Sequence, residues 1–179
     1  MNPNRPILIS VAQYEQELTA GACTVFDVID AAHRLGADGV ELRRETWRNM
    51  PDQVARARDR IEELGLLVAF ATHVTLFSAD AAGQETLRAD IDTAAALGSP
   101  ILRVFQGPAP ADDDDAAWDV GRAAVGYAAD QDIVVALETM HARQAGRSPK
   151  FAVCWIVSTR PRWRPTSTSP TMPATMRMW

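Results

Sequence analysis

The stretch AAHRLGADGVELR, residues 31–43, is the unit from which the fold is predicted. It joins the end of a helix with one apolar face, a Leu-Gly pair and a short apolar strand. The same plan returns at 60–73 as RIEELGLLVAFATH and at 92–107 as DTAAALGSPILRVFQG. A fourth unit, AAVGYAADQDIVVALETMH at 123–141, lacks the glycine. The chain is therefore predicted to repeat a helix–strand unit of about 30 residues.

The Leu-Gly pairs mark where the helices are expected to end. Glycine takes the left-handed conformation that stops a helix, and it stands here as Gly36, Gly65 and Gly98. Before the first pair, apolar residues recur at helical spacing from residue 25 to residue 35. This pattern predicts the first helix, with Thr24 as its N-cap.

Five apolar runs are predicted to be strands: ILIS at 7–10, GVEL at 39–42, LLVAFA at 66–71, ILRVF at 101–105 and IVVAL at 133–137. Units of this length imply parallel strands joined by right-handed crossovers. Continuous apolar runs are typical of strands that are buried on both faces. Two α/β folds fit this pattern, an open doubly wound sheet and a closed eight-stranded barrel.

The barrel is the better interpretation of the two. No strand is followed by a G-x-G-x-x-G or P-loop sequence, as a nucleotide-binding open sheet would have. Polar side chains instead follow the strands, and a barrel brings these points to one C-terminal rim. A complete barrel needs about 250 residues. The predicted fold class is therefore α/β of the (β/α)8 TIM-barrel type, truncated to about five strand–helix units.

Glu138 in VALETMH is the strongest candidate for chemistry, because it follows directly on a buried apolar strand. A carboxylate in this position needs a partner, and a divalent cation is one. A hydrogen bond to the backbone or an ion pair with an arginine is the structural alternative. His141, three residues later, is a candidate metal ligand, substrate contact or plain rim residue.

Three further polar residues occupy matching strand ends. Glu41 in GVELRRE is a candidate substrate contact, or else the partner of Arg43 or Arg44. His73 in FATHVTLF offers an imidazole for a metal or a sugar hydroxyl, or is a hydrogen-bonded rim histidine. Arg103 in ILRVFQG suits a phosphate or carboxylate group. The alternative for Arg103 is an interior ion pair with Glu138 or Glu41.

The acidic run Asp112–Asp115 receives a structural interpretation. It precedes the apolar positions of AAWDVGRAAVGYAA, and acids at a helix N-terminus complement the helix dipole. We therefore expect a helix start at this run rather than a metal site.

Composition limits the class of protein. The chain of 179 residues carries a net charge of −5 and two cysteines, Cys23 and Cys154, without a CxxC pair. This argues against a disulfide scaffold, a cysteine-rich zinc site and a dominant nucleic-acid surface. No apolar run is long enough for a signal peptide or a membrane span, so a cytoplasmic protein without a membrane partner is expected.

The charge divides the chain in two. Residues 1–141 hold 11 Lys and Arg against all 23 Asp and Glu, whereas residues 142–179 hold seven bases and no acid. We predict a boundary here, with a partial TIM-barrel domain at 1–141 and an aberrant basic tail, irregular or disordered, at 142–179.

GADGVELR, FATHVTLF, ILRVFQG and VVALETMH together resemble the xylose-isomerase-like TIM-barrel family. This group contains sugar phosphate isomerases and epimerases, with apurinic endonucleases as relatives, and the resemblance covers about residues 5–141. It implies a small sugar or polyol substrate and proton abstraction beside a carbonyl, assisted by a metal. A homo-oligomer is one alternative for its assembly.

The resemblance also implies a divalent metal, Mn, Mg, Co or Zn, in an intact member. The family holds it with a glutamate after the fifth strand, an aspartate after the sixth, a histidine after the seventh and a glutamate after the eighth. Only the first position maps here, onto Glu138, as a ligand and one of two acid–base carboxylates. The other ligands have no counterpart, so this chain is expected to be catalytically impaired and to hold no catalytic metal.

The tail STRPRWRPTSTSPTMPATMRMW, residues 158–179, leaves three hypotheses open. It is a basic arm that binds nucleic acid, which would make the chain a non-catalytic α/β binding module. It is native disorder, in keeping with its Pro, Ser and Thr content. Or it is family sequence read out of frame, since shifted Thr and Met codons conceal Asp and His. The third is preferred, and a nucleic-acid partner is not expected.

Overall fold

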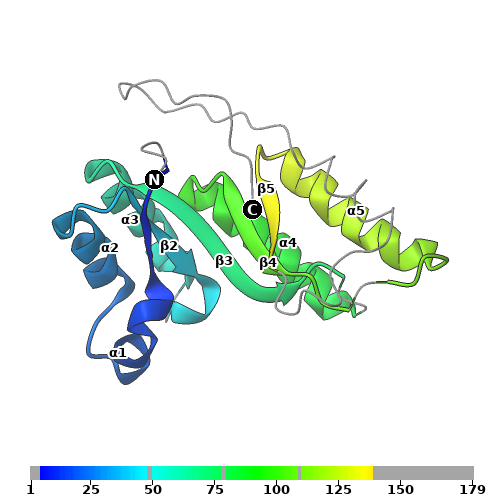
Figure 1. Ribbon diagram of the computed structural model, residues 1–179, viewed down its shortest axis with the longest axis horizontal. Coiled ribbons are helices and arrows are strands. Elements are labelled where there is room, and N and C mark those ends of the chain that lie inside the picture. Colours follow the sequence, from blue (N-terminus) through cyan, green and yellow to red (C-terminus); the bar gives the residue numbers. More distant parts are fainter. Residues whose placement is uncertain (1–4, 48–49, 78–79, 109, 139–179) are drawn as a thin grey trace.

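A computed structural model describes residues 5–47, 50–77, 80–108 and 110–138 (Figure 1). These residues form one five-stranded sheet in the order β1-β2-β3-β4-β5, with all neighbouring strands parallel. The strands are β1 Leu8–Ser10, β2 Gly39–Arg43, β3 Leu67–Thr75, β4 Ile101–Phe105 and β5 Val134–Glu138. The five predicted strands and their parallel pairing are confirmed.

A helix precedes each strand from β2 onward. These helices are α2 Val25–Arg34, α3 Met50–Glu63, α4 Ala81–Leu97 and α5 Asp115–Ala129; the short elements are η1 Val11–Tyr14, α1 Glu15–Ala20 and η2 Arg44–Thr46. The long helices lie against one face of the sheet (Figure 1). The α/β fold of the TIM-barrel type is confirmed, with five strands and the four long helices that join them in the described residues.

The four repeated units end their helices in the same way. Gly36, Gly65 and Gly98 have φ between 65° and 74°, and the N–H of the residue after each donates to a carbonyl five residues back. This bond closes the Schellman motif. In the fourth unit Asp132 takes the place of glycine, with φ 59°, and the N–H of Ile133 donates to the carbonyl of Ala128. Aspartate tolerates this conformation better than most residues do.

The predicted helix starts are confirmed. Thr24 caps α2 in a capping box, because Asp27 N–H donates to its hydroxyl and Thr24 N–H donates to the Asp27 carboxylate. Asp114 caps α5 and accepts from the N–H of Ala117, so the acidic run lies at a helix N-terminus as expected. These caps fix where two long helices enter the layer over the sheet.

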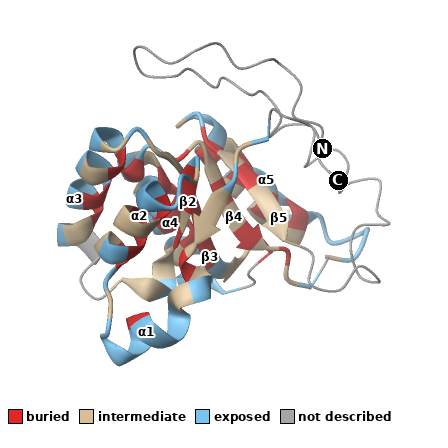
Figure 2. Cartoon of the chain, turned by 60° about the vertical axis from the view of Figure 1, so that its left-hand side comes forward, coloured by how far each residue is buried: buried red, intermediate tan, exposed pale blue. Residues whose placement is uncertain are grey.

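The core lies between the helices and the sheet (Figure 2). Val40, Leu42, Phe70, Leu102 and Val104 point to the helices and are fully buried. Residues that alternate with them on the other face of the sheet are mostly half-buried. We call this second face, which points away from the helices, the inner face. The prediction of strands buried on both faces is wrong for the inner face, because the five described strands form an open sheet.

The remaining predictions fall outside the described residues or concern the membrane. His141 and the predicted tail at 142–179 belong to the part of the chain that the structure leaves undescribed. Among the described helices, none combines the length and the apolar character that crossing a bilayer requires.

Candidate functional site

Four predicted site residues reach the inner face or the C-terminal rim of the sheet. Glu41 lies on β2, His73 near the end of β3, Arg103 on β4, and Glu138 is the last residue of β5. The strands are parallel and in register, so their carboxyl ends meet at one edge. The predicted meeting of the strand ends at one edge of the sheet is present, and the structure adds how the charges there pair.

Arg103 is the centre of the charge cluster. Its guanidinium forms an ion pair with Glu138 through Nη1, and its Nε lies 3.5 Å from Oε2 of Glu41. The arginine side chain is only 17% exposed. Its Nη2 is buried and has no hydrogen-bond partner among the described residues. Arg103 therefore bridges two carboxylates on different strands, while its Nη2 makes no hydrogen bond among the described residues.

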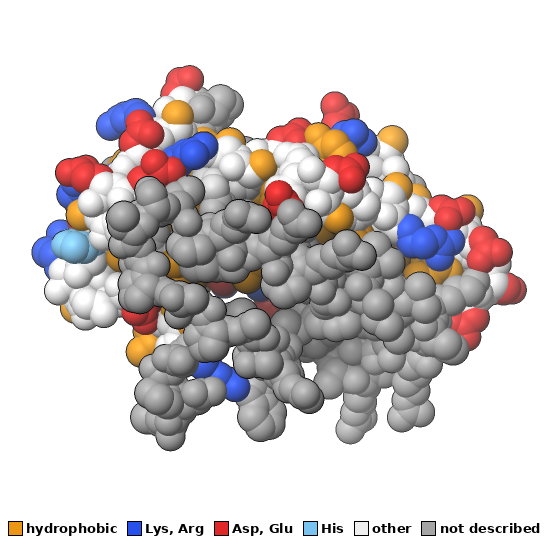
Figure 3. Space-filling view, turned by 90° about the horizontal axis from the view of Figure 1, so that it is seen from above, with side chains coloured by type: hydrophobic (Ala, Val, Ile, Leu, Met, Phe, Trp, Pro, Cys, Tyr) orange, Lys and Arg blue, Asp and Glu red, His pale blue; other side chains and the backbone are white. Residues whose placement is uncertain are grey.

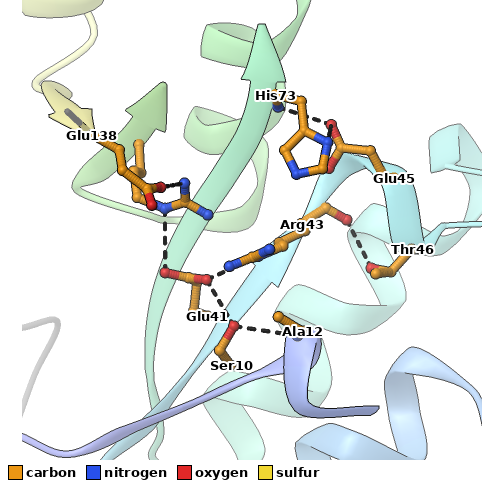
Figure 4. Close-up of polar contacts among 9 residues, drawn as sticks. Ser10, Ala12, Glu41, Arg43, Glu45, Thr46, His73 and Glu138 are labelled. Atoms are coloured by element: carbon orange, nitrogen blue, oxygen red, sulfur yellow. Dashed lines mark hydrogen bonds and ion pairs between the residues drawn. The ribbon is translucent and has the colours of Figure 1, made fainter. Parts of the chain in front are cut away.

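Glu41 is held from three sides (Figure 4). Its Oε1 accepts a hydrogen bond from the Ser10 hydroxyl at 2.8 Å and one from Arg43 Nε at 3.1 Å. Burial by itself raises the pKa of this carboxyl, but the Ser10 hydrogen bond and the charges of Arg103 and Arg43 outweigh it and lower the pKa. Glu41 is therefore a fixed carboxylate.

Small side chains on β3 make this cluster possible. Glu41 lies beside Ala69, and Arg103 lies beside Ala71, in the register of the sheet. These alanines share the inner face with the charged residues, because residues in register on parallel strands point the same way. A methyl group at both positions leaves room for Arg103 to reach across β3 to Glu41.

His73 makes no ion pair with the charge cluster, but it shares a neighbour with it, because the guanidinium of Arg103 lies 5.8 Å from the centroid of the Phe105 ring. The His73 ring stacks on Phe105, with centroids 5.5 Å apart, and its side chain is 52% exposed. Its backbone N–H donates to Oε1 of Glu45 at 2.9 Å, and its Nδ1 lies 3.7 Å from the same oxygen. Sequence reasoning did not identify Glu45 or Phe105. An acid in η2 and an aromatic ending β4 carry no signal of their own.

Arg44 does not pair with Glu41, which was one alternative for that glutamate. It forms an ion pair with Asp90 of α4, whose side chain is fully buried. The sequence alternative that Glu41 pairs with Arg43 is the one present. Neighbouring residues of β2 point to opposite sides of the sheet. This alternation extends to the residue after the strand. The side chain of Arg44 therefore points to the helix layer, whereas that of Arg43 lies on the inner face.

The described residues do not make a metal site. None of their His, Cys, Asp and Glu side chains gather in a group of three or more, as a cation would need. Glu138, the one ligand that the family pattern places here, is occupied by Arg103. Within this part of the chain the donor set does not fit a catalytic metal.

The surface seen in Figure 3 carries acidic and basic side chains next to one another over the described residues. Neither sign of charge covers it alone. Where Figure 3 shows described residues, these side chains do not form a uniform basic surface of the kind that tracks a phosphate backbone.

The five parallel strands, with a helix before each strand from β2 onward, have the arrangement of part of a TIM barrel. The sequence pattern of the xylose isomerase-like TIM barrel matches residues 29–156, more than half of the chain. The chain belongs to the xylose-isomerase-like TIM-barrel family. No curated protein matches it in sequence.

Solved structures support the same fold. A xylose isomerase domain protein from Planctomyces limnophilus superposes with a TM-score of 0.58 at 18% identity, over 80% of this chain and 58% of that one. D-allulose 3-epimerase from Methylomonas sp., in complex with D-allulose, gives 0.54 at 22%, over 76% and 53%. A probable 3-DHS dehydratase from Bacillus anthracis gives 0.60 at 16%, over 75% and 52%. The chain thus spans little more than half the length of these structures.

Proposed function

We propose that the inner face and rim of this sheet form part of a sugar site. The substrate class is a small sugar or polyol, and the chemistry is proton abstraction beside a carbonyl, as in isomerases and epimerases. One observation carries the proposal. Glu41, Arg103 and Glu138 converge on one face of the sheet near the C-terminal ends of their strands, and the active sites of TIM barrels lie at that end.

The charge pattern suits a neutral, hydroxyl-rich ligand. Each carboxylate is paired with an arginine, so the cluster has little net charge to attract an ion. Carboxylates accept from sugar hydroxyls, and a guanidinium donates to hydroxyl or carbonyl oxygens.

Glu138 is the proposed proton acceptor. It is the most exposed of the three paired residues, at 40%, so its second oxygen is the most accessible to a ligand. Removing a proton next to a carbonyl places negative charge on the carbonyl oxygen. Arg103 is the nearest positive group, and a fixed guanidinium stabilises charge of that kind.

We propose further that the 179-residue chain binds without turning over. A second acid–base carboxylate is needed to return the proton in an epimerisation, and Glu41 is held by Ser10 and two arginines. The metal that family members use would need ligands beyond the described residues. The chain is thus expected to be impaired as an enzyme.

Hydrogen exchange tests this proposal. The chain is incubated with D-allulose in D2O, with Mn, Mg, Co or Zn added in turn, and deuterium at the sugar carbons is followed by NMR. We expect incorporation no faster than in a blank. Metal-dependent incorporation that is lost in Glu138→Gln would contradict the proposed impairment.

For residues 142–179 we retain the out-of-frame origin as a proposal. It rests on the absence of acids and on the Thr and Met codons that conceal Asp and His. Sequencing the gene tests it. A continuous downstream frame that encodes further strand–helix units is the expected result, and stop codons in every frame soon after residue 179 would overturn it.

A further inference from the structure

Glu45 contacts His73 twice, through backbone and through side chain. The backbone N–H of His73 donates to Oε1 of Glu45 at 2.9 Å, and Nδ1 of the ring lies 3.7 Å from that same oxygen (Figure 4). At 3.7 Å the ring contact is longer than a hydrogen bond, but a negative charge beside one imidazole nitrogen favours the proton on that nitrogen. Glu45 is therefore placed to select the form of His73 that bears its proton on Nδ1.

The plane of the ring is fixed as well. The imidazole of His73 stacks on Phe105 at an interplanar angle of 28°. With Nδ1 facing Glu45 and one ring face on Phe105, Nε2 lies on the opposite edge of the ring. No hydrogen bond from Nε2 is present among the described residues. In the Nδ1–H form this nitrogen is an acceptor for a donor from outside the chain.

The two partners are anchored through their neighbours in sequence. Arg44, next to Glu45, forms an ion pair with the fully buried Asp90 of α4. Burial raises the pKa of this Asp90 carboxyl, and the nearby hydroxyl of Thr72, next to His73, opposes that shift only in part. Asp90 thus holds Arg44 by an ion pair and lies near Thr72, and these two residues directly adjoin Glu45 and His73.

We propose that Glu45 is a positioning residue that holds His73 in its Nδ1–H form, with Nε2 presented to a sugar hydroxyl. The hydroxyl donates its hydrogen to Nε2, and no covalent step is involved. The choice of a sugar hydroxyl rests on the proposed function, whereas the Glu45–His73 couple stands on geometry alone. Glu45 acts on the ligand through His73 and through nothing else.

Nitrogen NMR of the imidazole tests the couple directly. The full chain is labelled with 15N and measured without ligand at about pH 8.5, where an ordinary histidine is neutral. The His73 signals are assigned by their loss in His73→Gln. We expect the Nδ1–H form to be the major one, and to become the minor one in Glu45→Ala.

Two variants separate this effect from general damage. Glu45→Gln keeps an oxygen that accepts from the His73 backbone N–H but lacks the charge, so an intermediate proportion of the two forms is expected. Glu62→Ala removes an exposed acid of α3 that pairs with Arg58 and should leave His73 unchanged. Unchanged proportions in both Glu45 variants would overturn the proposal.

Titration with D-allulose distinguishes a failure of the couple from a failure of the proposed function. If Glu45→Ala shifts the proportion of the two neutral forms of His73 and also weakens D-allulose binding, the Glu45–His73 couple and the sugar site are both supported. If Glu45→Ala shifts the proportion of the His73 forms in the unliganded chain but no D-allulose binds, the Glu45–His73 couple is supported and the proposed sugar site is rejected. If Glu45→Ala changes neither D-allulose binding nor the proportion of the His73 forms, the Glu45–His73 couple is rejected, while the proposed sugar site is still supported.

Discussion

Arg103 is the residue on which the inner face of the sheet depends most. It bridges carboxylates from β2 and β5 while its own strand lies between β3 and β5. Removing it would leave Glu138 without its ion-pair partner and Glu41 with fewer positive neighbours. The cost falls mainly on Glu41, which is 23% exposed, because a partly buried carboxylate that loses a positive neighbour destabilises the fold.

We therefore expect Arg103→Met to lower the free energy of unfolding by about 1–3 kcal/mol. Urea unfolding followed by circular dichroism measures this. The matched control is Arg122→Met, because Arg122 pairs with Asp119 on the exposed surface of α5 and should change stability by less than about 0.5 kcal/mol. If both variants lowered the free energy of unfolding equally, the charge cluster around Arg103 would stabilise the fold no more than an exposed ion pair does.

Glu41 makes the stability of the fold depend on pH. Its pKa is lowered in the folded chain, so the stabilisation it gives is complete above the unfolded value of about 4.3 and is lost as pH falls through the folded value. In Glu41→Gln this contribution is absent at every pH. We expect the stability gap between wild type and Glu41→Gln to be widest near neutral pH and to narrow below about pH 4.

Unfolding curves at a series of pH values check this. The comparison with the variant is needed because Asp90 acts in the opposite direction. Burial raises its pKa, so its contribution favours the folded chain at low pH and declines as pH rises through the folded value. A gap that stays constant from acid to neutral pH would contradict the assignment of Glu41 as a fixed carboxylate.

At the scale of the elements, the contact between β2 and β3 leaves no room at its first residue. A Cβ built at Gly39 would lie 2.3 Å from the carbonyl oxygen of Leu67 and 2.7 Å from its Cβ. Gly39 is in register with Leu67, so both strands start at this point. Backbone atoms cannot give way as a flexible side chain can.

We expect Gly39→Ala to destabilise the chain by at least about 2 kcal/mol, because the strands must separate or shift. Gly126→Ala is the control, since a Cβ at that position of α5 meets nothing within 4 Å. Alanine is the better helix former, so this variant should gain about 0.5–1 kcal/mol. Thermal unfolding of both variants gives the comparison, and a stable Gly39→Ala would refute the close approach.

The elements were predictable where their signals are local. Gly36, Gly65 and Gly98 end helices through their own backbone freedom, and Thr24 caps through a residue three positions away. Asp132 was not predictable, because aspartate gives no comparable sign of a positive φ. Its role becomes visible only once Ile133 is seen to make the bond that follows each of the glycines.

The rim was predictable in outline and not in its pairings. Strand ends point to Glu41, His73, Arg103 and Glu138 because parallel strands end together. The ion pair of Arg44 with Asp90 and the contact of His73 with Glu45 join residues 46 and 28 positions apart. Such contacts depend on the turn that η2 makes and on the packing of α4, neither of which a sequence pattern specifies.

At the scale of the whole molecule, the described sheet has two edges. β1 and β5 each have one partner strand among the described residues, and the inner face is only half-buried. Parallel edges and half-buried faces promote pairing between chains. We expect sedimentation velocity to show association that increases with protein concentration, and a single monomeric species at all concentrations would contradict this.

The account as a whole depends on the inner face being a sugar site, and saturation binding of D-allulose measures this most directly. We predict saturable binding to the 179-residue chain, weakened about tenfold by Glu138→Gln or Glu41→Gln, in keeping with the loss of one charged hydrogen bond each. Glu62→Gln should bind as the wild type does. Absence of saturable binding, or equal binding by all three variants, would contradict the account.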